Sequence, residues 1–119
     1  MPDNSVVLNN LAVAYDELGD SRAIDTALRA YESSPENPAI ADTLGWIHVK
    51  RGDASSGLPY LEQAAAELAA IDEVRYHLGV ALEETGDTAR AREIYESLLA
   101  NDTEYGWRED VEQRLTDLR

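Results

Sequence analysis

Two short motifs recur together along this chain, and their spacing constrains the fold more than any other feature. Each copy has a Leu-Gly or Leu-Ala pair, followed by a Gly-Asp pair about two helical turns later. The three copies are Leu11-Ala12 with Gly19-Asp20, Leu44-Gly45 with Gly52-Asp53, and Leu78-Gly79 with Gly86-Asp87. The first two copies are 33 residues apart and the last two are 34 apart. A period of this length predicts a helical repeat in which every unit is one pair of helices.

Apolar residues between these breaks recur at helical spacing, so we expect an all-α chain of seven helices with no strand. We expect the 119 residues to form one domain with units at about 5–37, 38–71 and 72–104. A last helix at about 105–118 has one apolar stripe, made by Trp107, Val111, Leu115 and Leu118. The end of a repeat array needs a capping element with a polar outer face, and we assign that role to this helix.

Local signals predict where individual helices begin. Ser5 and Asp72 are residue types that cap helix N-termini, so we expect the first helices of units one and three to start there. Pro59 lies early in the second helix of unit two and removes a hydrogen-bond donor. We therefore expect that helix to start late, at Ser55 or Ser56, or to bend at Pro59. Leu44 is predicted to be a core residue.

The positions of these residues resemble the tetratricopeptide repeat (TPR) family over nearly the whole chain. The matching residues are Leu11-Ala12, Tyr15, Ala23, Ala30 and Pro35 in unit one, Leu44-Gly45, Leu61 and Ala64 in unit two, and Leu78-Gly79, Ala91 and Tyr95 in unit three. His48 and Leu82 stand where the family has Tyr, and Gly57 where it has Ala. The resemblance implies an α-solenoid of three helix-turn-helix units plus the cap, and a non-enzymatic scaffold for protein–protein interaction.

A narrower resemblance concerns bacterial TPR lipoproteins of exopolysaccharide export and the PEP-CTERM sorting system. The segments that resemble their C-terminal repeats are 8–12, 37–46 and 75–79. This likeness implies that the chain is the tail of a longer protein of the periplasm or envelope. If the chain is complete, we expect a cytoplasmic protein, since Met1 to Asn4 do not form a signal peptide. The localisation stays open between these two.

Composition limits the partner. The formal net charge is −14, which disfavours nucleic acid and anionic membrane surfaces. There is no run of about 20 apolar residues that would insert into a membrane. A protein or peptide with apolar and basic groups is the natural complement. The acidity also fits solubility or a habitat of high salt, and both explanations remain open.

The family resemblance implies that the first helices of successive units line a concave groove. The candidate partner-binding residues are Asn9, Val13, Asp42, Trp46, Lys50, Tyr76, His77, Val80, Glu83 and Glu84. In this register Trp46 lies at the centre, between Val13 and Val80, with acidic residues at the rim. A central Trp is a typical affinity anchor. The alternative is that Trp46 packs against a neighbouring helix.

Other chemistry has little support. His48 and His77 have no metal-ligand spacing to each other, and the chain has no cysteine. We therefore expect no catalytic, cofactor or metal site. Some family members bind the C-terminal carboxylate of heat-shock chaperones through a basic clamp, but the matching positions carry no Lys or Arg. Those positions are Asn9, Val13, Thr43, Glu73 and His77.

Two hypotheses from different classes follow. In the first, the chain is an interaction module that holds an apolar and basic peptide or helix in its groove. In the second, it is a structural segment of a longer solenoid whose ends stack on further repeats. The second hypothesis predicts an apolar N-terminal edge that also permits self-association.

Overall fold

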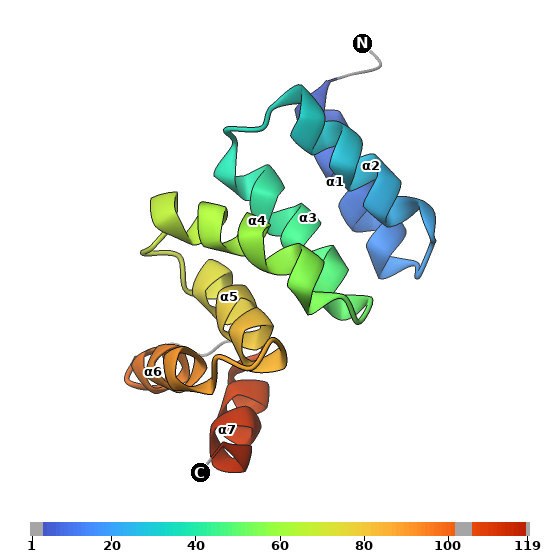
Figure 1. Ribbon diagram of the computed structural model, residues 1–119. Helices are drawn as coiled ribbons and strands as arrows, with labels where there is room; N and C mark the ends of the chain where they lie inside the picture. The colour runs from blue at the N-terminus through green and yellow to red at the C-terminus, as the bar shows by residue number, and fades with distance from the viewer. Residues whose placement is uncertain (1–3, 102–105, 119) are drawn as a thin grey trace.

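The computed structural model describes residues 4–101 and 106–118, and these residues form seven α-helices and no strand. The helices are α1 Ser5–Glu17, α2 Arg22–Ser33, α3 Pro38–Lys50, α4 Ala54–Glu67, α5 Asp72–Glu84, α6 Thr88–Leu99 and α7 Arg108–Asp117. The pairs α1/α2, α3/α4 and α5/α6 follow one another along an elongated molecule of 47 × 25 × 24 Å, with α7 at the C-terminal end (Figure 1). The predicted all-α solenoid is confirmed.

The Gly-Asp motif ends one helix and begins the next. Gly19, Gly52 and Gly86 have φ angles of 69°, 86° and 100°, which L-residues with a Cβ rarely adopt. The Asp that follows then caps the second helix in units two and three. Asp53 Oδ1 accepts a hydrogen bond from the Ser56 amide at 3.2 Å, and Asp87 Oδ1 accepts one from the Arg90 amide at 3.3 Å. A two-residue motif thus produces the sharp antiparallel turn within each unit.

Helices α1 and α5 begin at Ser5 and Asp72 as predicted, but the predicted capping residues need correction. Asn4, not Ser5, caps α1, because its Oδ1 accepts a hydrogen bond from the Val7 amide at 3.1 Å. Asn37 caps α3 in the same way, so the cap itself repeats with a 33-residue period. Asp72 is the first residue of α5, and Ile71 occupies the cap position without a side-chain hydrogen bond.

The second helix of unit two does not start late. It begins at Ala54, because Asp53 caps it, and Pro59 lies inside it. The Pro59 ring removes the amide that would bind the Ser55 carbonyl. Both residues are solvent-exposed, so water can reach that carbonyl. The helix therefore keeps its full length despite the proline.

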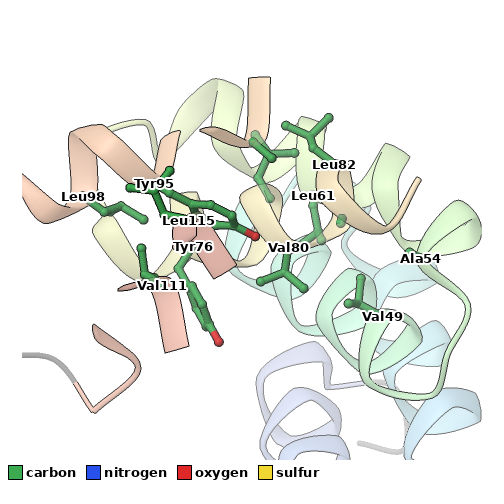
Figure 2. Close-up of a cluster of buried hydrophobic side chains, with 13 residues drawn as sticks. Val49, Ala54, Leu61, Tyr76, Val80, Leu82, Tyr95, Leu98, Val111 and Leu115 are labelled. Carbon is green, nitrogen blue, oxygen red and sulfur yellow. The ribbon is translucent and has the colours of Figure 1, made fainter. Parts of the chain in front are cut away.

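The largest buried cluster lies in the C-terminal half of the molecule. It joins α3 and α4 to α5, α6 and α7, and Figure 2 shows its side chains converging from these helices. Tyr95, Leu61, Leu82 and Leu98 are among its most buried members. Leu44 is fully buried, as predicted, in a second cluster with Ala12, Ala27 and Ile47.

Helix α7 does more than cover the end of α6. Tyr76 of α5 donates a hydrogen bond to Asp110 Oδ2 of α7 at 2.5 Å, and its ring stacks on Trp107 with centroids 4.7 Å apart. Arg114 of α7 lies 3.2 Å from Glu83 Oε1 and 2.7 Å from Asp110 Oδ2. Helix α7 thus lies against α5 as the next first-type helix of the array. Among the described helices, none has the length and apolar character needed to cross a membrane.

Candidate partner-binding groove

A cavity of about 260 Å³ lies between the first helices of the three units. Helix α1 contributes one wall, α3 the floor and α5 the other wall. The lining residues are Val13, Asp16, Glu17, Asp42, Thr43, Trp46, Ile47, Lys50, Glu73 and His77. Four of these are carboxylates and one is a lysine, so the cavity is strongly acidic. It lies between the first helices, which the family resemblance leads us to expect to line a concave groove.

Trp46 and His77 form the aromatic part of this cavity. Their rings are stacked, with centroids 4.1 Å apart and an interplanar angle of 17°. His77 is buried, and its Nδ1 lies 2.9 Å from Asp42 Oδ1. Asp42 and His77 therefore fix one side of Trp46, which is half-buried and still lines the cavity. The Trp46 ring thus packs against α5 and also lines the cavity, and its role as a binding anchor stays a prediction.

Lys50 and Asp16 form an ion pair across the cavity, from the last turn of α3 to the last turn of α1. Lys50 Nζ also lies 5.8 Å from the centre of the Trp46 ring. Arg51 Nη2 approaches the other carboxylate oxygen of Asp16 at 3.8 Å. The one lysine of the cavity is therefore already paired within the protein.

Two further predicted residues lie on α1. Val13 is partly exposed and lines the cavity beside Trp46. Asn9 is half-buried and does not line it. Its Oδ1 is buried without a hydrogen-bond partner among the described residues.

The remaining predicted residues lie where α7 covers α5, so the groove does not extend over them as we expected. Tyr76 and Val80 are buried, and Val80 belongs to the same cluster as Val111 and Leu115 of α7. Glu83 accepts hydrogen bonds from Tyr95 at 2.8 Å and from Arg114 at 3.2 Å. Glu84 lies 3.8 Å from Arg114. These two carboxylates are thus partly neutralised within the protein.

Sequence reasoning missed these pairings, although the repeat itself carries a signal for them. Lys50 and Asp16 are 34 residues apart, Tyr76 and Asp110 also 34, and His77 and Asp42 are 35 apart. Residues one repeat apart on the first helices therefore lie next to each other. Complementary polar groups at that separation predict contacts along the groove.

The structure describes another hollow of about 450 Å³ between α6 and α7. It is lined by Glu96, Leu99, Ala100, Glu112, Leu115 and Thr116. No aromatic ring or histidine lines it, and it contains none of the predicted site residues. Although it is larger, we regard the cavity around Trp46 as the better candidate. Within residues 4–101 and 106–118, no cluster of His, Asp or Glu is arranged to hold a metal ion.

Comparison with known proteins agrees with this architecture. The family model for the tetratricopeptide repeat matches residues 43–105. A TPR repeat-containing protein of Pseudomonas aeruginosa is 35% identical over an alignment of 82 positions, which covers 66% of this chain and 13% of that protein. Photosystem I assembly protein Ycf3 of Prochlorococcus marinus is 38% identical over 53 residues, or 44% of this chain and 31% of that protein. The chain thus spans less than a third of either relative.

Two solved structures have the same fold. The first TPR domain of Spaghetti (RPAP3), bound to an HSP90 peptide, superposes with a TM-score of 0.81 at 16% identity over 96% of this chain and 89% of that one. MamA from Desulfovibrio magneticus RS-1 superposes with a TM-score of 0.83 at 21% identity over 98% of this chain and 64% of that one. At these identities the likeness concerns the fold alone.

Proposed function

The chain belongs to the tetratricopeptide repeat family, and we propose that it is a non-enzymatic scaffold that holds a short apolar segment with basic flanks in its groove. The TPR fold generally serves as a scaffold for protein–protein interaction. The observation that carries the proposal is the cavity around Trp46, where an aromatic ring lies among four carboxylates. An aromatic anchor in a partly enclosed site is typical of residues that dominate binding energy.

The charge of the cavity favours a basic partner. Asp16 is paired with Lys50, and Asp42 lies against His77. In the described part of the chain, no ion pair involves Glu17, and Glu73 approaches only His77, at 3.9 Å. Carboxylates without a nearby cation attract a positively charged segment and raise its rate of association.

The bound peptide of the Spaghetti domain, SRMEEVD, is acidic and offers a useful contrast. The positions that correspond to a basic clamp in this chain are Asn9, Val13, Thr43, Glu73 and His77, which supply no lysine or arginine. We therefore propose that this chain also binds a peptide, but with the opposite charge preference.

The test uses two blocked peptides, each with a pair of leucines flanked by two arginines or by two glutamates. Calorimetric titration should detect binding of the arginine peptide and not of the glutamate peptide. Trp46→Ala should weaken the binding of the arginine peptide, whereas Leu28→Ala should not, because Leu28 is an exposed apolar residue of α2 outside the cavity. Equal binding of both peptides, or no effect of Trp46→Ala, would contradict this function.

The N-terminal edge favours a second function, in which this chain is one segment of a longer solenoid. In units two and three, the matching positions of the first helix are buried against the preceding unit. They are Ile40, Leu44 and Ile47 in unit two, and Val74, Leu78 and Ala81 in unit three. Their counterparts one repeat earlier are Val7, Leu11 and Ala14, and these are exposed, as is Leu18 at 81%. The exposed stripe on α1 is therefore the kind of surface that a preceding second-type helix covers.

This second function is tested by adding a unit. A copy of residues 38–70, placed before Asn4, brings an α4-type helix next to α1 in the natural register. If the edge is a stacking surface, urea unfolding should show a gain in stability that Leu11→Asp removes. An extended chain with no such gain, or one in which Leu11→Asp has no effect, would argue against it.

A place in a bacterial envelope or an exopolysaccharide-export protein remains a more specific version of this second function. It is supported by the likeness of segments 37–46 and 75–79 to the repeats of such lipoproteins and by the greater length of the relatives. The full reading frame of the gene tests it. Further repeats upstream, preceded by a lipoprotein signal, would support it, and their absence would contradict it.

A further inference from the structure

We propose that Lys50 is an internal ligand of the groove: in the free protein its ammonium group occupies the place between Asp16 and Trp46 that a basic side chain of the partner takes. Partner binding then displaces Lys50 into solvent. This inference rests on the proposed groove function and adds the residue with which the partner competes. It also gives the cationic subsite a definite position, at the α1 wall of the cavity.

The contacts of Lys50 are those expected of a bound basic side chain. Its ammonium group pairs with the Asp16 carboxylate and lies 5.8 Å from the centre of the Trp46 ring. An opposite charge together with an aromatic face is a typical environment for a ligand cation. Trp46 lies one helical turn before Lys50 on α3, and both side chains line the cavity. Lys50 therefore belongs to the surface that we propose binds the partner.

The two members of the ion pair differ in how firmly they are held. The Asp16 side chain is only 10% exposed, whereas the Lys50 side chain is 43% exposed. Asp16 also has Arg51 beside its other oxygen at 3.8 Å, and Arg51 is itself anchored by a hydrogen bond to the Asp20 carbonyl at 3.0 Å. The carboxylate is therefore a fixed receptor, while the lysine can swing outward on its four-carbon stem.

If the ion pair had a purely structural role, it would serve to hold α1 against α3. Those helices are already joined through Ala12, Leu44 and Ile47, which are buried in one cluster. Ion pairs at the surface contribute little to stability, and the lysine end of this pair is in contact with solvent, so displacement of Lys50 should reduce partner affinity by about fivefold or less. A guanidinium ion can also bind a carboxylate through two parallel hydrogen bonds, which an ammonium ion cannot do. An arginine of the partner can therefore compete with Lys50 for Asp16.

The experiment exploits the fact that Lys50 is the only lysine in the sequence. Lysine labelled with ¹³C at Cε gives one side-chain signal, which reports whether Lys50 is bound or free. The probe is the blocked leucine peptide with arginine flanks, and the indole N–H signal of Trp46, assigned with Trp46→Phe, reports its binding independently. In Asp16→Asn the Lys50 signal should already be at the position of free lysine.

We expect the probe to shift the Lys50 signal toward the free position as the Trp46 signal shifts. Lys50→Met should bind the probe about two- to fivefold more tightly than the unmodified protein. Arg51→Met is the matched control. It removes the same charge near Asp16 but leaves Lys50 in place, so its gain in affinity for the probe should be smaller than that of Lys50→Met.

The remaining outcomes overturn the inference in distinguishable ways. If Trp46 responds but the Lys50 signal does not move, or if Lys50→Met binds no more tightly than Arg51→Met, the groove function stands and the internal ligand does not. If Lys50→Met binds more weakly, Lys50 contacts the partner directly. If neither the unmodified protein nor Lys50→Met binds, both the groove function and this inference fail.

Discussion

Gly57 of α4 lies directly against the backbone of Gly45 on α3. A Cβ on Gly57 would be 2.4 Å from the Gly45 carbonyl oxygen, and a Cβ on Gly45 would be 2.7 Å from Leu61 Cγ. The two helices of unit two therefore approach each other closely because both residues lack a side chain. This contact sets the position of α3, which carries Trp46 and Lys50.

Gly57→Ala should destabilise the protein by about 1 kcal/mol. Alanine gains about 1 kcal/mol over glycine in helix propensity, but overpacking against rigid backbone typically costs about 1–3 kcal/mol, and the helices must separate as well. Urea unfolding measures the change. Gly106→Ala is the control, because a Cβ there meets no atom within 4 Å. An equally stable Gly57→Ala protein would mean that α3 and α4 tolerate a wider spacing.

Leu44→Ala should reduce the free energy of unfolding by roughly 2–5 kcal/mol, as is usual for a fully buried leucine. Leu11 occupies the same repeat position in unit one but is 39% exposed. Leu11→Ala should therefore cost about 1–2 kcal/mol in the chain as it stands, less than Leu44→Ala. Similar losses for the two variants would show that the α1 edge is covered in solution, and sedimentation would then reveal self-association.

The pH dependence of stability should have an alkaline limit set by two tyrosines. Burial raises the pKa of both Tyr76 and Tyr95 well above the usual value, and their hydrogen bonds to Asp110 and Glu83 add to the effect. Because the folded pKa is the higher one, this stabilisation is complete below the unfolded pKa of about 10 and is lost as the pH rises above it.

The ultraviolet absorbance of phenolate measures tyrosine ionisation directly, and the chain has six tyrosines. Tyr76 and Tyr95 should ionise late and together with unfolding, and Tyr76→Phe should reduce that late step by one tyrosine. In the urea-unfolded protein all six should titrate together. Simultaneous ionisation of all six in the folded protein would contradict the burial of these phenols.

Rim charge should control how fast a basic partner associates. Glu17 and Glu73 line the cavity, whereas Glu83 and Glu84 lie beside Arg114. The double variant Glu17→Gln with Glu73→Gln should slow association and flatten its salt dependence, because exposed charges act mainly by steering. Stopped-flow rates at two salt concentrations measure this. The control, Glu96→Gln with Glu112→Gln, makes the same charge change at the hollow between α6 and α7. Equal slowing in the two double variants would indicate a net-charge effect only.

The sequence alone was sufficient for the fold. The Gly-Asp pairs predict the turns, because glycine readily adopts the positive φ angle that such a turn needs, as Gly52 and Gly86 do. The burial of Leu44 follows from the same period. These features are local or repeat at a fixed interval, so one unit informs the next. The same register, together with the family resemblance, predicts that Trp46 faces the groove, and Trp46 lines the cavity.

The extent of the groove depends on tertiary packing that no repeat period contains. Tyr76 and Val80 occupy repeat positions that would face an open groove, yet both are buried where α7 packs on α5. Tyr76 donates a hydrogen bond to Asp110 of α7 and stacks on Trp107, the residue just before that helix. The pairing of Lys50 with Asp16 likewise depends on tertiary structure, because it requires that α3 and α1 lie close enough for the two side chains to meet. Helical periodicity determines which face of a helix is apolar. Only the packing of whole helices decides which of those faces a neighbour covers and which remain open to a partner.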